Sequence, residues 1–393
     1  MRAAKTLFAA RVYIERKEKD MRIFGMSLRD RIRRIDPILF WAAFVLSLIS
    51  IVTIFGAVDN FGRSKLIMQC AMTAVGIVAL FVIANLDYRF LVDRFSLWLF
   101  FGSVVLLAIT LLFGKSGENM ETGNQSWLQI PFIGIAIQPS EFVKIAFLCT
   151  FAGPIDAVKN KLNHPLTLLG LLVHAGIIVG LILISGDLGV ALVYMVLVIV
   201  MLFAAGLHWG YFAGLFGAVA VAFPFLWDYL ESYQQDRIVV GFNPSLDPTD
   251  KGWQPLLSRQ CIENGGLLGV GLNGGGDYER LAASHTDFIF ATICEKFGFL
   301  GGILVIATLA TLTVRVLWIA RGASRDYGMY IAVGVAAILI AQTLENVGMC
   351  LALLPTVGIT LPFLSCGGSS MLATFMLLGM VHSVGAHKPA RRY

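Results

Sequence analysis

Long runs of apolar residues recur along most of the chain, separated by short polar segments. A helix needs about 20 apolar residues to span a bilayer core, and ten runs of roughly that length occur. They lie near residues 38–58, 66–86, 95–113, 140–158, 166–184, 188–206, 211–227, 288–314, 328–350 and 368–386. The short alternating segments of an outer-membrane barrel are not seen in the sequence. The pattern therefore predicts an all-α polytopic membrane protein with about ten transmembrane helices.

Composition agrees with this fold class. Of the 393 residues, 57% are hydrophobic and only 14% are charged, which is too little charge to cover the surface of a soluble domain. The six cysteines have no CxxC spacing and the histidines no metal-ligand spacing, so the cysteines are interpreted as small hydrophobes and no zinc site is expected. The net charge of +5 reflects membrane topology and gives no evidence for nucleic acid binding.

Lys and Arg are distributed unevenly among the connections. Residues 1–36 hold eleven of them, and if this segment is cytoplasmic the inner connections hold 21 and the outer ones seven. Because positive charge accumulates on the cytoplasmic side, both termini are predicted to be cytoplasmic. The chain then divides into a basic cytoplasmic tail (1–36), one membrane domain (37–386) and a short cytoplasmic tail (387–393).

Two of the outer loops are long, near residues 114–139 and 228–287, and loops of this length usually carry function. The larger loop joins the seventh and eighth predicted helices. Its residues 265–276 include seven glycines, which permit positive φ angles or a close approach of the backbone to a ligand. A flexible loop without function is the alternative.

Ionisable side chains stand at the mouth of the fourth predicted helix. Glu141 and Lys144 are three residues apart on one helix face and can form an ion pair. Such groups in a membrane helix indicate a polar cavity, although a purely structural salt bridge fits equally well. Ser140 is expected to cap this helix, with Pro139 before it. Trp127, in the preceding loop, is expected to anchor at the membrane interface.

The residues His285, Thr286 and Asp287 stand directly before the eighth apolar run. Asp287 and Asp187 can each cap the helix that follows, a role that Asp favours and that is worth about 1 kcal/mol. Periodicity alone favours capping for Asp287. For Asp187, a cap and a supporting position beside the site are equally consistent with the sequence.

Further polar and small residues are predicted on the same side of the membrane. Glu295 and Lys296 lie just inside the eighth apolar run and form a third charged site. The stretch from the end of the ninth run to the start of the last one adds Asn346, Pro355, Ser365, Gly367, Gly368 and Ser369. These positions are expected to converge on one outward-facing mouth.

Several motifs occur in a specific order: QPSEFVK (138–144), GDLGVAL (186–192), NGGLLGVGL (264–272), HTDFIFA (285–291) and the LP, VGI, LP and GGSS elements of 354–370. In this combination the chain resembles the SEDS family of RodA-, FtsW- and SpoVE-like proteins of shape, elongation, division and sporulation, with a slight lean to RodA. The resemblance extends from about residue 36 to residue 384.

The resemblance implies a peptidoglycan glycosyltransferase that polymerises lipid II in the bacterial plasma membrane, with its site on the extracytoplasmic face. It also implies a class B penicillin-binding protein as partner. Asp287 matches the family's catalytic aspartate, Glu141 and Lys144 match its QPSExxK pair, and Trp127 and Asp187 match a loop tryptophan and the DLG aspartate.

Some positions depart from the family pattern. Ser126 stands where the family usually has Arg, Trp253 replaces the Tyr of a GYQ element, and Lys296 replaces a second acidic residue. The segment before HTDF reads Leu281-Ala282-Ala283 in place of LPE, and Ser185-Gly186 precedes Asp187 in place of Gln-Pro. These changes leave the core carboxylate in place but weaken the inference on substrate-phosphate contacts.

The chemistry of glycan polymerisation fits these residues. An acceptor hydroxyl must lose a proton as it attacks the anomeric carbon, so Asp287 is predicted to be the general base. Arg237, Lys144 or a divalent cation (Mg²⁺ or Mn²⁺) would stabilise the departing diphosphate, and the metal requirement is not fixed by the sequence. The supporting residues predicted around the base are Glu141, Lys144, Trp127, Asp187, Arg237, Gln254, His285, Thr286, Ser365, Gly367, Gly368 and Ser369.

Two functions without glycosyl transfer are alternatives. A flippase for lipid-linked precursors would need polar groups along the whole transit path, and the inner halves of most apolar runs lack charges. A secondary ion transporter would place its carboxylates near the membrane midplane, whereas those of this chain are predicted near one face.

Overall fold

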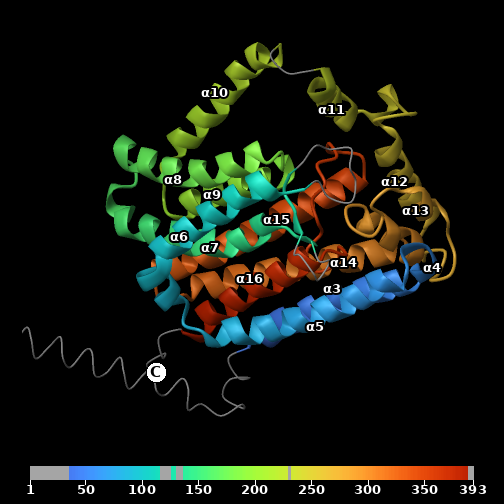
Figure 1. The fold of residues 1–393 in the computed structure, drawn as a ribbon, viewed down its shortest axis with the longest axis horizontal. Coiled ribbons are helices and arrows are strands. Elements are labelled where there is room, and N and C mark those ends of the chain that lie inside the picture. Colours follow the sequence, from blue (N-terminus) through green and yellow to red (C-terminus); the bar gives the residue numbers. More distant parts are fainter. Residues whose placement is uncertain (1–34, 116–124, 130–135, 229–231, 388–393) are drawn as a thin grey trace, which may run out of the picture.

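A computed structural model describes residues 35–115, 125–129, 136–228 and 232–387. Most of the predicted tails, 1–36 and 387–393, therefore lies outside the described residues. Within the described part the chain is a helical bundle with short helices clustered over one end (Figure 1). The predicted helical fold class is confirmed.

Each of the ten apolar runs coincides with a helix in the described part of the chain. The helices are α3 (Pro37–Phe55), α5 (Arg63–Asn85), α6 (Tyr88–Phe113), α7 (Pro139–Val158), α8 (Pro165–Ile184), α9 (Leu188–Ala204), α10 (Trp209–Trp227), α14 (Ile289–Arg321), α15 (Asp326–Cys350) and α16 (Gly368–Ala386). The shorter elements are α4 (Val58–Phe61), β1 (Leu128–Gln129), β2 (Ala136–Ile137), η2 (Lys159–Lys161), α11 (Ser232–Phe242), η3 (Pro244–Leu246), α12 (Trp253–Asn264) and α13 (Asp277–Arg280).

Length and apolarity qualify seven of the described helices as membrane-spanning: α3, α5, α6, α8, α14, α15 and α16. Helix α9 and the apolar part of α10 are shorter, and α7 carries the charged residues Glu141, Lys144 and Asp156. The chain is thus a multi-pass membrane protein. The count of ten spans, and their orientation, remain predictions.

Helices α15 and α16 form the centre of the bundle. Helix α16 packs against α5, α7, α14 and α15, while α15 packs against α7, α9 and α14. Most of their side chains are buried, in contrast to those of α6, which are largely exposed. The first turn of α16 lies beside the start of α7, where Gln138 N donates to Ser369 Oγ, at the end of the bundle that carries the loops, here called the loop end.

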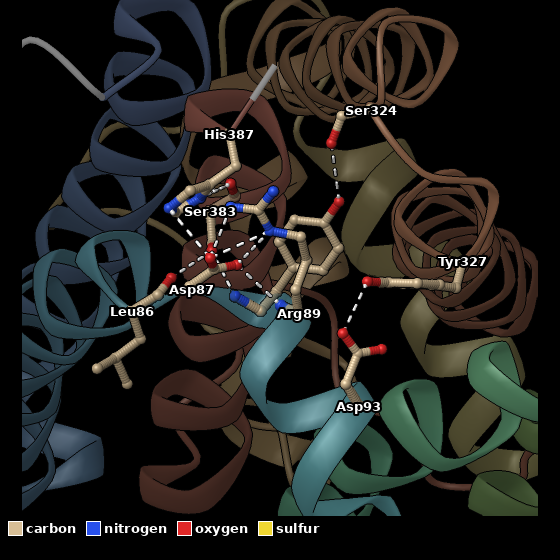
Figure 2. Close-up of polar contacts among 9 residues, drawn as sticks. Leu86, Asp87, Arg89, Asp93, Ser324, Tyr327, Ser383 and His387 are labelled. Atoms are coloured by element: carbon tan, nitrogen blue, oxygen red, sulfur yellow. Dashed lines mark hydrogen bonds and ion pairs between the residues drawn. The ribbon is translucent and has the colours of Figure 1, made fainter. Parts of the chain in front are cut away.

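Polar contacts fix the other end of α16 (Figure 2). Asp87 forms an ion pair with Arg89 at 2.7 Å and lies 3.9 Å from His387 Nε2. The backbone N–H of Tyr88 donates to Ser383 Oγ at 3.2 Å, and Ser383 Oγ donates to the Leu86 carbonyl. These contacts tie the last turn of α16 to the connection between α5 and α6, and so help to fix the position of the first turn at the loop end.

Helix α14 is broken at Gly298, whose φ of 68° and ψ of −169° are not helical. The glycine turn, residues 265–271, fills the break. Four backbone hydrogen bonds join them: Val270 N to Glu295 O at 3.0 Å, Gly271 N to Lys296 O at 3.1 Å, Phe299 N to Gly266 O at 2.8 Å and Leu300 N to Leu267 O at 3.2 Å. A Cβ on Gly269 would lie 2.1 Å from the Lys296 carbonyl oxygen. In the structure, these glycines allow the backbone of the turn to approach α14 closely.

Glu295 and Lys296 have a structural explanation in the same region. The Glu295 carboxylate accepts from the backbone N–H groups of Gly276, Asp277 and Tyr278 at 2.9–3.1 Å. Both residues are buried, so their polar groups need such partners. The third charged site expected from the sequence therefore acts as an attachment point for the loop that precedes His285.

Replacing Gly298 by Ala is expected to destabilise the protein by about 1–3 kcal/mol, because only Gly adopts this backbone conformation without strain. A Cβ there would also lie 2.4 Å from Gly269 N and 2.5 Å from Leu267 O. Thermal unfolding in detergent measures the effect. Gly170→Ala is the control, since no atom lies within 4 Å of its added Cβ in α8. Equal melting temperatures for the two variants would contradict the assigned role of Gly298.

Candidate functional site

Four segments that are distant in sequence meet at the loop end. They are the start of α7, the turn between α8 and α9, residues 285–288 before α14, and the loop after α15 together with the first turn of α16. Gln138 links three of them: its Nε2 donates to Asp187 Oδ2 at 2.7 Å, and its backbone N–H donates to Ser369 Oγ at 3.1 Å. The fourth is joined through Gly358, which lies beside Asp287.

The His285–Asp287 segment is held by its backbone carbonyls. Asn346 Nδ2 donates to the carbonyl oxygens of Asp287 and Ile359, each at 2.7 Å. Ser365 Oγ donates to the Thr286 carbonyl at 2.7 Å. The Cys366 N–H donates to the His285 carbonyl at 2.8 Å. Since three consecutive carbonyls are fixed in this way, the Asp287 side chain is presented in a defined direction.

The Asp287 carboxylate does not cap α14. The N-cap residue is Phe288, and no side-chain hydrogen bond closes this helix start, so the capping interpretation is wrong. Asp287 Oδ2 lies 3.4 Å from the position that a Cβ on Gly358 would occupy, and Gly358 has a φ of +71°. A side chain at residue 358 would therefore contact the carboxylate, and the positive φ would strain the backbone of any residue other than Gly.

Burial raises the pKa of Asp287 from 3.8 to about 6, while a hydrogen bond from Thr286 acts in the opposite direction and the negative charge of Asp187 adds to the rise. A carboxylate with a pKa near 6 is ionised at neutral pH and is a stronger base than an exposed aspartate. These are the properties that general-base catalysis requires.

Asp187 caps α9, one of the two roles considered for it, and its supporting role in the site stays a prediction. Its Oδ1 accepts from Val190 N at 3.1 Å and so caps α9, while its Oδ2 accepts from Gln138. Burial raises the pKa of Asp187, and the charge of Glu141 adds to the rise while that of Lys144 lowers it. Asp187 is therefore electrostatically coupled to Asp287 and to the pair on α7.

Glu141 and Lys144 form the predicted ion pair, with Nζ and Oε1 2.6 Å apart. Both side chains are almost fully buried in the described structure. The expected Ser140 cap is wrong: Gln138 is the N-cap residue and Pro139 occupies the first helical position. Ser140 instead accepts a hydrogen bond from Tyr194 Oη at its carbonyl, at 2.8 Å.

Trp127, Gln254 and Arg237 are also predicted from the sequence to support the base. Trp127 pairs through its backbone with Lys115. Gln254 Oε1 accepts from Ala282 N at 2.8 Å and supports the chain before His285. Arg237 belongs to α11, but its side chain lies outside the described residues.

Gly367 and Gly368 form the N-terminus of α16, where a Cβ on Gly368 would lie 2.9 Å from the Met72 methyl. His285 packs its ring against Phe61 at 5.4 Å. These residues support the loop-end backbone, while Ser365 and Ser369 make the side-chain contacts described above.

Three residues of this region were not assigned to the site from the sequence: Gln138, Tyr194 and Gly358. Asn346 was expected at the mouth as a polar residue of a membrane helix, but its bond to the Asp287 carbonyl could not be assigned from the sequence. No local pattern distinguishes Tyr194 or Gly358. Among the described residues, no group of three or more His, Cys, Asp or Glu side chains could hold a metal ion.

Comparison with known proteins agrees with these observations. Residues 34–390 match a family model for FtsW, RodA and SpoVE, described as cell cycle proteins. The probable peptidoglycan glycosyltransferase FtsW of Trichlorobacter lovleyi is 33% identical over 365 residues, covering 91% of this chain and 94% of the relative. The peptidoglycan glycosyltransferase MrdB of Escherichia coli is 31% identical over 320 residues, covering 80% and 84%.

The fold has a counterpart among solved structures. A chain of a peptidoglycan synthase complex that coordinates polymerization and crosslinking superimposes with a TM-score of 0.76 at 26% identity, over 89% of this chain and 97% of that one. Relatives named FtsW and MrdB match to similar degrees, so the lean to RodA is not specifically confirmed. With a family match over almost its entire length and relatives above 30% identity, the chain belongs to the SEDS family of FtsW, RodA and SpoVE proteins.

Proposed function

We propose that this peptidoglycan glycosyltransferase polymerises lipid II into glycan strands with Asp287 as its general base. The names of its relatives support the activity. The observation that carries the residue assignment is the Asp287 carboxylate itself, which is free of any capping bond, is partly buried beside Gly358 and has a pKa raised to about 6.

The reaction joins two lipid-linked sugars. The acceptor 4-hydroxyl attacks the anomeric carbon of the donor, a C–O bond forms, and the bond from that carbon to the diphosphate breaks. The diphosphate leaves as an anion and needs no strong general acid, whereas the attacking hydroxyl must lose its proton. Asp287 accepts this proton in an inverting displacement.

Positive charge is needed where the diphosphate leaves. Lys144 is coupled electrostatically to Asp187 and so belongs to the same polar region, and Arg237 belongs to the loop between α10 and α14. Both are proposed to stabilise the departing group. A divalent cation remains an alternative source of this charge, and no step is assigned to it.

The reaction is proposed to occur on the extracytoplasmic face, with a class B penicillin-binding protein as partner. The excess of Lys and Arg in the connections at the opposite end supports this orientation. The structural neighbour from a peptidoglycan synthase complex supports a partnership with a crosslinking enzyme.

Fluorescent lipid II given to the reconstituted protein tests the function, with and without a cognate penicillin-binding protein. Glycan chains are the expected product. Translocation of the dye without product would indicate the alternative, a lipid-linked precursor flippase. If the assay gives no glycan product and no translocation of the dye, a secondary ion transporter would be favoured.

The rate of polymerisation is expected to rise with pH up to about 6 and then to level off, because the base must be ionised and burial raises the pKa of Asp287 to about 6. Below that value the rate should fall about tenfold per pH unit. Initial rates between pH 5 and 8 measure the profile. A rate that does not change between pH 5 and 7 would exclude Asp287 as the titrating base.

Asn346→Ala is expected to lower kcat by about 10–100-fold, because the backbone carbonyl of Asp287 loses its side-chain donor and small displacements of a catalytic group are costly. KM should change little. Asn85→Ala is the matched control: Asn85 Nδ2 also donates to a backbone carbonyl, that of Phe81, but at the opposite end of the bundle. Comparable losses of kcat in both variants would indicate a general folding effect.

A further inference from the structure

The glycine turn exposes apolar side chains although it belongs to a loop that the sequence places in water. Leu267 and Leu268 are 70% and 77% exposed, and Val270 is exposed as well. A contiguous apolar patch on a surface usually marks a contact with a partner or a membrane. The position of the turn relative to the membrane-spanning helices identifies that contact.

Two contacts between α3 and α14 show at which level these helices leave the hydrocarbon core of the membrane. At one end Asp36 forms an ion pair with Arg315 at 2.7 Å, and at the other Lys296 Nζ donates to the Gly56 carbonyl at 3.1 Å. Between them lies α3, which has 19 residues, most of them apolar, and this is close to the length needed to span the hydrocarbon core. Lys296 and Gly56 therefore mark the level at which these helices leave the hydrocarbon.

The glycine turn is attached at this same level. Its hydrogen bonds run to residues 295–300 of α14, and Lys296 Nζ donates to the carbonyl of Leu272, the next residue after the turn, at 2.7 Å. The bonds from Phe299 and Leu300 lie three and four residues past Lys296 along α14, toward the membrane interior. The turn thus lies at the hydrocarbon boundary.

The apolar surface of the turn is continuous with that of a membrane-spanning helix. Phe299 and Leu300 are exposed on α14, as are Ile303 and Leu304 one turn further on. Because Leu300 N is bonded to the Leu267 carbonyl, the exposed leucines adjoin this lipid-facing surface. The bonds across the α14 break also satisfy backbone groups of the turn, which is the condition for non-helical backbone at membrane depth.

We propose that the glycine turn inserts Leu267, Leu268 and Val270 among the acyl chains of the bilayer leaflet that adjoins the site. The partner of this surface is the hydrocarbon of membrane lipids. Insertion anchors the loop to the membrane between α12 and α13, ahead of the His285–Asp287 segment. The proposal does not depend on the reaction that the site catalyses.

An environment-sensitive fluorescent amino acid at residue 268, in the full chain reconstituted into phosphatidylcholine vesicles, tests the insertion. Lipids brominated at carbons 6 and 7 of an acyl chain should quench it several-fold more than lipids brominated at carbons 11 and 12, because the turn lies near the boundary. Aqueous iodide should quench it weakly. The same fluorophore at residue 259 is the control, since Arg259 is exposed on the neighbouring α12 and paired with Glu263.

Iodide is expected to quench the fluorophore at residue 259, and brominated lipids are expected to leave its fluorescence unchanged. Equal iodide quenching at both residues, with no effect of either brominated lipid at residue 268, would overturn the proposal. If the fluorophore at residue 268 prevents folding, the same measurement at residue 267 decides the question, because Leu267 is exposed on the same turn.

Discussion

Asp287→Asn is expected to reduce the polymerisation of lipid II by about 10²–10⁴-fold, the range over which a positioned general base accelerates a reaction. Asn has nearly the same shape and keeps the backbone carbonyl that Asn346 holds. It cannot accept the proton of the attacking hydroxyl. Initial rates of glycan synthesis by the purified variant measure the loss, and a rate equal to that of the wild type would refute the assignment of the base.

The variant should remain folded, and this separates lost catalysis from lost structure. The raised pKa of Asp287 means that the folded protein holds this proton more tightly than the unfolded chain does. Ionisation therefore reduces stability as pH rises from about 4 to about 6, and a neutral Asn avoids this cost. Thermal unfolding at pH 7.5 should show a melting temperature at least as high as that of the wild type. Asp250→Asn, at an exposed loop position, is the matched control for both activity and stability.

Lys144→Met is expected to destabilise the protein by about 3–5 kcal/mol, because it leaves the Glu141 carboxylate buried without its partner. The double variant Glu141→Gln with Lys144→Met removes both charges and should recover most of this stability. Thermal unfolding of the single and double variants in detergent measures the difference. A single variant as stable as the wild type would show that Glu141 has another partner or access to water.

Activity in the same variants decides whether the pair also has a role in the reaction. If Lys144 stabilises the departing diphosphate, the double variant folds but polymerises lipid II slowly. The charge swap Glu141→Lys with Lys144→Glu adds a second comparison, since it keeps an ion pair but moves the cation by one helical turn. Full activity of the swapped protein would assign the pair a structural role only.

Helix limits and contacts that depend only on residues near in sequence could be predicted closely. The run at 368–386 coincides with α16, and that at 140–158 differs from α7 by one residue, because a membrane helix satisfies its backbone hydrogen bonds within its own segment. The ion pair of Glu141 and Lys144 was predictable for the same reason, since residues three apart share a helix face. The cap of α7 was predicted wrongly as Ser140. Pro139 is suited to the first helical position, so the N-cap residue is Gln138.

The candidate site shows where such reasoning stops. Motifs indicated Asp287, but its capping alternative could be rejected only once the geometry of the start of α14 was known. The donors that hold its segment, Asn346 and Ser365, are 59 and 79 residues from their acceptors. No local periodicity relates positions so far apart, and Gly358 is recognisable only from what it lies against.

Residue types and their order along the chain were thus sufficient for the helical membrane fold, for the approximate helix limits and for the choice of Asp287 as the candidate base. The folded arrangement was needed to place Asn346 on the Asp287 carbonyl and to show that the glycine turn packs into the break at Gly298. The physical difference lies in how far apart along the sequence the interacting residues are. Helix formation in a bilayer depends on neighbouring residues and local hydrogen bonds, whereas a site is assembled from contacts that exist only after distant helices have packed together.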